Sequence, residues 1–139
     1  MTLRFLLDTS IVSAPVAKKP NAGVLRRLRH EGAMCGIAAP VWHELVFGVG
    51  RLPPGKKRDA LDEYLRLVVE RSFPILPYDQ IAAAWHGTER ARLERLGKMP
   101  PFVDGQIAAV AHSHDLTIVT ANPKDFSPFV GVRVADWTS

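Results

Sequence analysis

Hydrophobic and polar positions along the chain form two patterns, short continuous apolar runs and longer stretches with helical periodicity. The apolar runs predict buried strands at Leu3–Leu7, Cys35–Ala39, Leu116–Thr120 and Val132–Val134, with a short extended segment at Phe73–Pro77. The periodic stretches predict helices over Ile11–Ala17, Val41–Val49, Lys56–Arg71 and Val103–His114. Asn21 and Asp79 are placed to cap two further helices, which run through His30 and to about Leu96.

The alternation of strands and helices favours one fold class. Parallel strands need crossover connections, and the helices that make these crossovers cover the faces of the sheet. The strand segments are apolar almost throughout, as expected for strands buried on both faces. We therefore predict an α/β protein with three layers, α/β/α, and a short central parallel sheet of four to five strands. No repeat or linker divides the chain, so residues 1–139 are expected to form one domain.

The charge balance indicates a class of partner. The chain has 18 Lys or Arg against 14 Asp or Glu, a net charge of +4, and the positive excess lies in residues 1–100. A basic surface favours anionic partners, of which nucleic acid is the commonest, although a solvated surface explains the same balance. The single cysteine, Cys35, excludes an internal disulfide and fits a reducing cytoplasm. Leu3–Leu7 is too short for a signal peptide, and no apolar run is long enough to span a bilayer.

Polar side chains follow two of the predicted strands. Asp8 comes directly after Leu3–Leu7, and Asn122 comes just past Leu116–Thr120. Ligands of open parallel sheets bind beyond the carboxyl ends of the strands, so these side chains meet if their strands are neighbours. Asp104 opens the helix that leads into the second of these strands. Ordinary roles explain the same residues singly, since aspartates cap helices and Asn-Pro is a common turn dipeptide.

Four segments, in order along the chain, carry a family resemblance. They are Phe5-Leu6-Leu7-Asp8-Thr9-Ser10-Ile11, Pro40-Val41-Trp42-His43-Glu44-Leu45, Asp104-Gly105-Gln106-Ile107-Ala108-Ala109 and Leu116-Thr117-Ile118-Val119-Thr120-Ala121-Asn122-Pro123-Lys124-Asp125-Phe126. Together they resemble the motifs of PIN-domain ribonucleases, particularly toxins of the VapC type. The resemblance runs from end to end and implies a PIN-like fold that gathers Asp8, Glu44 and Asp104 in one pocket.

The resemblance implies a metal-dependent endoribonuclease. Three carboxylates in one pocket repel one another, and Mg²⁺ or Mn²⁺ with oxygen ligands relieves this repulsion. Asp8 and Asp104 are expected as direct ligands, and Glu44 as a ligand through water or as the group that positions the attacking water. Asn122 stands where many PIN domains place a fourth acid, and it is expected to orient the waters of the metal. Because Asn122 is neutral, the sequence does not decide whether the site binds one metal ion or two.

Further residues and partners are expected around this pocket. Thr120, Arg92 and Arg95 are candidate substrate contacts, the two arginines through phosphates, although a solvated helix face explains the arginines equally well. Asp125 is assigned to the closing turn and not to the site. The resemblance implies an RNA substrate, which is a transfer RNA for many relatives, a cognate antitoxin that covers the pocket, and a homodimer.

Other functions stay open from the sequence alone. Asn122 is compatible with a PIN-like module that binds RNA or protein without cutting it. The metal chemistry needs no 2′-hydroxyl, so it is equally compatible with a DNA nuclease. A near match to a phosphate-binding loop at Gly50–Lys57 is set aside, because it follows a helix and has Lys57 where that motif needs Ser or Thr. His112 and His114 have no cysteine nearby and are not assigned to a metal.

Overall fold

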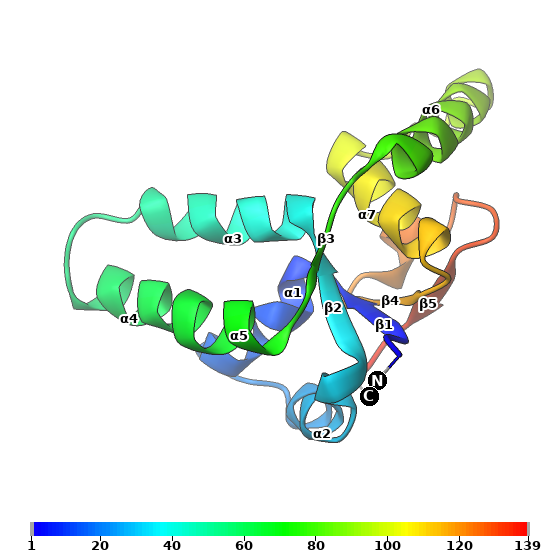
Figure 1. Ribbon diagram of the computed structural model, residues 1–139. Coiled ribbons are helices and arrows are strands. Elements are labelled where there is room, and N and C mark those ends of the chain that lie inside the picture. Colours follow the sequence, from blue (N-terminus) through cyan, green and yellow to red (C-terminus); the bar gives the residue numbers. More distant parts are fainter. Residues whose placement is uncertain (1, 139) are drawn as a thin grey trace.

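Five short strands pair in parallel to form one sheet. The computed structural model describes residues 2–138, in which the strand order is β3–β2–β1–β4–β5 (Figure 1). The strands are β1 (Phe5–Leu7), β2 (Cys35–Ala38), β3 (Ile75–Leu76), β4 (Thr117–Val119) and β5 (Arg133–Ala135). Leu6, at the centre of β1, pairs with Gly36 of β2 and Ile118 of β4. The predicted strand segments are therefore confirmed to within two residues at each end.

Helices between the strands cover both faces of the sheet, which confirms the predicted three-layer α/β/α architecture. They are α1 (Thr9–Val12), α2 (Ala22–Glu31), α3 (Ala39–Gly50), α4 (Lys56–Tyr64), α5 (Glu70–Ser72), α6 (Gln80–Arg95) and α7 (Phe102–Ser113). Short 3₁₀ turns form η1 (Ala14–Val16), η2 (Gly32–Met34) and η4 (Pro123–Phe126), and the π-helical segment η3 (Leu65–Val69) joins α4 to α5. No helix within residues 2–138 is long and apolar enough to cross a membrane.

Helix starts follow the sequence, with one informative difference. Asn21 Oδ1 accepts the N–H of Val24 at 3.0 Å where α2 begins, and Asp79 Oδ1 accepts the N–H of Ala82 at 3.0 Å where α6 begins. At α7, however, Pro101 occupies the capping position and Asp104 lies within the first turn. Capping therefore does not account for Asp104.

The buried faces of the helices are predicted only in part. Helical periodicity predicts Ile107, Ala108, Val110 and Ala111 on the inward side of α7, and all four are buried. On α6, periodicity predicts Ile81 as a core contact, but it is 70% exposed, while His86 and Glu89 are buried in the same helix. This part of the prediction is wrong because a polar residue can be buried when it has partners, and the partners of these two lie elsewhere in the chain.

In the helical segment before β3, the buried face differs by one residue from the face that periodicity predicts. Helical periodicity predicts Leu65 and Val68 on the inward side; Leu65 is buried, but Val68 is 44% exposed and Val69 is fully buried in its place. These residues belong to the π-helical segment η3, in which the backbone bonds from residue i to residue i+5 and the turn is wider. The wider turn brings the next residue along, Val69, to the inward side.

The order of the strands places a switch point between β1 and β4. From β1, the chain adds β2 and β3 on one side of the sheet and then β4 and β5 on the other. The N–H of Asp8 donates to the carbonyl oxygen of Val119 at 2.9 Å and so ties the ends of β1 and β4 together. Such a switch point, at the carboxyl ends of the strands, is where open parallel sheets bind ligands.

Candidate metal-binding active site

Asp8 is held in one orientation through both of its carboxylate oxygens. Oδ1 accepts the N–H of Thr9 at 2.8 Å, and Oδ2 accepts the hydroxyl of Thr120 at 2.8 Å. The Thr120 oxygen in turn accepts the N–H of Asn122 at 3.0 Å. Thr120 is fully buried, so the prediction that it contacts substrate is wrong. Its one hydroxyl proton is directed to Asp8, and its role is to orient that carboxylate.

Glu44 reaches the same region from α3. The Thr9 hydroxyl donates to Glu44 Oε2 at 3.1 Å, so Thr9 binds Asp8 through its backbone and Glu44 through its side chain. Thr9 was not singled out in the sequence, because a threonine after a strand also suits the start of a helix. The structure makes it the direct link between two of the predicted site residues.

The carboxyl of Asp104 is affected both by burial and by the other acidic residues. It is half-buried in the first turn of α7, and the pKa of its carboxyl is raised from 3.8 to about 6. Burial is the largest cause, followed by the negative charges of Asp125, Asp8 and Glu44. The three predicted acidic residues therefore share one electrostatic environment at the ends of β1 and β4.

Asp125 belongs to this acidic group, so its assignment to the turn alone is wrong. It does lie in the turn η4, where its N–H donates to the Asn122 carbonyl at 3.0 Å. Its charge nevertheless raises the pKa of Asp104 more than that of Asp8 or Glu44 does. Asn122 is exposed at the same edge, and its side chain does not cap η4. A carboxylate three residues after Asn122 thus supplies the fourth negative charge.

The side chains at this edge suit a hard divalent cation. The donors are carboxylate and amide oxygens, which Mg²⁺ and Mn²⁺ prefer. Within residues 2–138, no three acidic, histidine or cysteine side chains are already close enough together to enclose an ion. Like charges repel and keep carboxylates apart, and a cation removes that repulsion. The raised pKa of Asp104 fits a cation site, because burial and, after it, the charges of the neighbouring carboxylates disfavour the ionised form, and a cation would offset both.

The basic residues of α6 differ in their surroundings. Arg92 Nε and Nη2 donate to Glu89 at 2.8 and 2.9 Å, and Nη2 also donates to the Pro128 carbonyl at 3.0 Å. Glu89 is buried and also accepts the N–H of Val130, and the Arg92 bonds hold its pKa below the usual range. These contacts contradict the predicted phosphate role of Arg92, since its guanidinium joins α6 to the segment before β5. Arg95 is exposed and stays a candidate.

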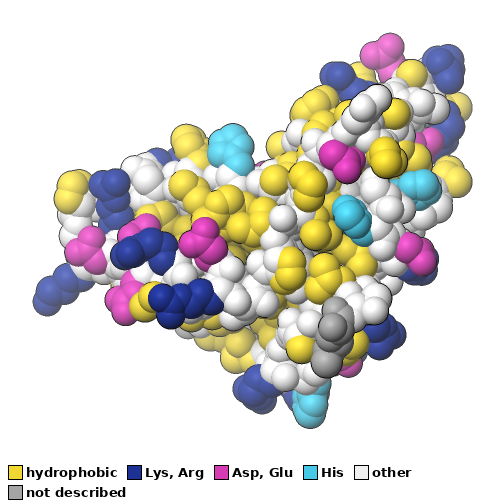
Figure 2. Space-filling model, in the orientation of Figure 1, with side chains coloured by type: hydrophobic (Ala, Val, Ile, Leu, Met, Phe, Trp, Pro, Cys, Tyr) yellow, Lys and Arg dark blue, Asp and Glu magenta, His cyan; other side chains and the backbone are white. Residues whose placement is uncertain are grey.

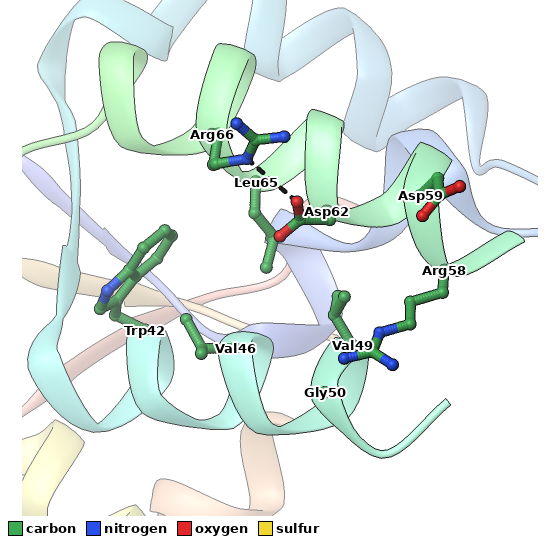
Figure 3. A pocket seen from close by; sticks show the side chains of 9 residues that line it. All are labelled: Trp42, Val46, Val49, Gly50, Arg58, Asp59, Asp62, Leu65 and Arg66. Atoms are coloured by element: carbon green, nitrogen blue, oxygen red, sulfur yellow. Dashed lines mark hydrogen bonds and ion pairs between the residues drawn. The ribbon is translucent and has the colours of Figure 1, made fainter. Parts of the chain in front are cut away.

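Two cavities border α3. An apolar groove of about 350 Å³ lies between η1, α3 and α4 and includes Thr9 and Glu44 in its lining. A second cavity, of about 510 Å³, lies between α3 and α4, where Figure 3 shows Trp42 and Val46 beside an ion pair of Arg66 and Asp62. Figure 2 shows hydrophobic side chains gathered over the space between these two helices. Of the two, the groove is the one that adjoins the acidic residues.

Known proteins share both the sequence and the fold. Residues 5–128 match the PIN domain family. The chain is 34% identical to the tRNA(fMet)-specific endonuclease VapC of Shigella flexneri, over 98% of this chain and 99% of that protein. It is 36% identical to Toxin FitB of Neisseria gonorrhoeae, over 87% and 89%. The solved structure of FitAB bound to the IR36 DNA fragment superposes with a TM-score of 0.87 at 31% identity, over 97% and 96% of the two chains.

The chain belongs to the PIN-domain family. Within that family its relatives place it among the toxins of the VapC type, as the sequence motifs predicted. The DNA-bound VapBC of Salmonella typhimurium has the same fold, with a TM-score of 0.83 at 28% identity over 97% of this chain and 98% of that one.

Proposed function

We propose that this protein is a Mg²⁺- or Mn²⁺-dependent endoribonuclease that acts as the toxin of a toxin–antitoxin pair. One observation carries the proposal: at the switch point of the sheet, burial and the charges of three other carboxylates together raise the pKa of Asp104. RNA as the substrate is supported by relatives named as a tRNA(fMet)-specific endonuclease and as a ribonuclease. A structured RNA such as transfer RNA is the substrate class that we propose.

Asp8, Asp104 and Glu44 would hold the ion. A bound ion would turn a water into a nucleophile near neutral pH and offset the negative charge of the attacked phosphate. The chain itself supplies orientation, since Thr9 and Thr120 fix the Asp8 carboxylate and leave lone pairs on both of its oxygens. The positive end of the α7 dipole lies at Asp104 and favours its ionised form.

Cleavage assays with a matched control test this proposal. Wild type, Asp8→Asn and Asp115→Asn are incubated with RNA and with DNA, in Mg²⁺, Mn²⁺ or EDTA. Asp115 lies just before the opposite end of β4, and asparagine tolerates its φ of 55°. We expect RNA cleavage with either metal, none in EDTA, unchanged cleavage by Asp115→Asn and a loss of more than about 100-fold in Asp8→Asn.

Each other outcome refutes a different part of the proposal. Cleavage in EDTA, or by Asp8→Asn at the wild-type rate, would show that the acidic group does not hold a catalytic metal. Preferred cleavage of DNA would support a DNA nuclease. Tight RNA binding without cleavage in either metal would support a binding module.

We further propose that the cognate antitoxin lies along the groove between η1, α3 and α4. The groove is apolar and reaches Thr9 and Glu44, so a chain bound there ends at the acidic group. An arginine or lysine of that chain would then occupy the place of the cation. Val16 lines the groove and is 43% exposed, so Val16→Asp is expected to leave the urea midpoint unchanged. It should weaken antitoxin binding, measured by calorimetry, by about tenfold or more, and unchanged affinity would exclude this groove.

A homodimer is the assembly that we propose for the toxin. Light scattering on the purified toxin should give about twice the chain mass of 15.3 kDa. A mass that stays at one chain up to micromolar concentrations would contradict this proposal.

A further inference from the structure

A buried histidine lies directly behind the first turn of α7. His86, in the middle of α6, is 3% exposed, and its Nδ1 is 2.8 Å from the hydroxyl oxygen of Tyr78. Its ring also packs against Phe102, the first residue of α7, with the ring centres 4.9 Å apart. One edge of the imidazole is therefore bound by Tyr78, while its face and other edge are turned toward α7.

The other edge of the ring meets the backbone of Gly105. A β-carbon added at Gly105 would lie 2.7 Å from His86 Cδ2 and 3.0 Å from Cε1, and closer still to Nε2. Such approaches do not occur between real atoms, so the two residues fit together only because residue 105 has no side chain. Gly105 directly follows Asp104, and both belong to the first turns of α7. The contact that seats Gly105 therefore also sets the position of Asp104.

The surroundings of the ring keep it neutral and in place. Burial lowers the pKa of His86, and the charge of Arg90 lowers it further. The Arg90 guanidinium itself lies over the Phe102 ring, with Cζ 5.2 Å from the ring centroid. A neutral imidazole with one hydrogen-bond partner can be buried without a counter-ion. The first turn of α7 is therefore packed against α6 through one cluster of side chains, formed by Tyr78, His86, Arg90 and Phe102.

We propose that His86, oriented by Tyr78, is a positioning residue for Asp104. The hydroxyl of Tyr78 holds one edge of the imidazole, and the opposite edge packs against Gly105. Because Asp104 and Gly105 are adjacent in the same helical turn, this packing also determines where the Asp104 carboxylate lies. Displacements of about 1 Å at a catalytic group change rates strongly, so such a support matters for cleavage. The effect on cleavage rests on the function proposed above, whereas the effect on the Asp104 carboxylate does not.

A double-mutant cycle of unfolding free energies, measured without metal, tests the placement of Asp104 independently of catalysis. Tyr78→Phe removes the hydroxyl and keeps the aromatic ring, so the fold is retained. It is combined with Asp104→Asn, and urea unfolding is measured in EDTA at pH 7.5. If Tyr78 and His86 set the position of Asp104, the two substitutions are coupled, and the unfolding constant of the double variant departs from additivity by more than about threefold. Additive effects would overturn the proposal, whatever the protein catalyses.

RNA cleavage separates positioning from a merely structural role. Tyr78→Phe and His86→Gln are expected to lower kcat about tenfold with KM unchanged, because the surface that binds RNA is not altered. Ser113→Ala is the matched control, since it removes a hydroxyl bond to the Ala109 carbonyl, 2.7 Å long, at the far end of α7. It should leave kcat unchanged and should be additive with Asp104→Asn.

The outcomes of the two measurements are distinguishable. A folded Tyr78→Phe protein with wild-type kcat would overturn the proposal. A wild-type protein that cleaves no RNA would refute the proposed function instead, and the stability cycle would then decide the role of His86.

Discussion

Replacing Asp104 with asparagine should stabilise the protein in the absence of metal. The pKa of this carboxyl is about 6 in the folded protein, against an ordinary value of 3.8. A group whose pKa is raised by folding contributes stability that is fully present below its unfolded pKa and is lost as the pH rises through the folded value. For Asp104 the loss occurs between about pH 4 and pH 6. At pH 7.5 the wild-type protein therefore carries the full cost of an ionised Asp104, which asparagine avoids.

The size of the effect follows from the shift and from the exposure of the residue. A shift of about two pKa units corresponds to at most about 3 kcal/mol. Asp104 is only half-buried, so solvent screening reduces this value to about 1 kcal/mol. The lost charge in the first turn of α7 subtracts about 0.3 kcal/mol. The expected gain at pH 7.5 is thus slightly below 1 kcal/mol, or about 3 °C in Tm.

Urea unfolding in EDTA at pH 4.5 and pH 7.5 measures this gain. Asp104→Asn should be more stable than wild type at pH 7.5. This advantage should be smaller at pH 4.5, where Asp104 of the folded wild type is mostly protonated. Asp115→Asn, which alters an exposed ion pair with Arg133, should show no gain at either pH. Mg²⁺ should then stabilise the wild type more than Asp104→Asn. If Asp104→Asn has no advantage at pH 7.5, the inference that burial and the neighbouring carboxylates disfavour the charge of Asp104 is refuted.

Gly105→Ala should destabilise the protein by about 2 kcal/mol, because the new β-carbon overlaps the His86 ring. Gly87→Ala, in open space on α6, should stabilise it by about 0.5 kcal/mol, and urea midpoints measure both. Glu89→Gln should cost about 2 kcal/mol at pH 7. The cost should shrink below pH 4, because the lowered pKa of Glu89 makes its contribution disappear as the pH falls through that pKa; unfolding free energies from pH 3 to 7 test this. Arg92→Ala should leave the salt dependence of RNA binding unchanged, whereas Arg95→Ala should lower its slope by about 1. A reduced slope in Arg92→Ala would restore its phosphate role.

The sheet and most helices could be predicted because their signals are local. Runs such as Phe5–Leu7 are apolar throughout, and Ile118 and Val119 of β4 are fully buried, so these segments favour the interior. The inward side of α6 could not be predicted in the same way. His86 and Glu89 are buried because Tyr78 and Val130 satisfy them, and helical periodicity carries no information about such partners.

The candidate site could likewise be predicted only in part. Asp8, Glu44 and Asp104 were identified through motifs, and the structure places them in one electrostatic environment. The roles of Thr120 and Asp125 depend on how the end of β4 meets the end of β1, and no local pattern specifies that meeting. The sequence predicts only a turn at Asp125, because the nearby Asn122-Pro123 dipeptide is a turn signal and carries no information about the distant acidic residues.

The bond between Thr120 and Asp8 joins residues 112 positions apart, and this separation has a consequence during synthesis. The ribosome makes β1 before β4, so Asp8 lacks the neighbouring strand β4 and the orienting hydroxyl of Thr120 until residue 120 has been added. An unfinished polypeptide is accordingly expected to be harmless to RNA, and chains truncated before Thr117 should be inert. The order of segments thus delays the proposed activity until β4 has been made.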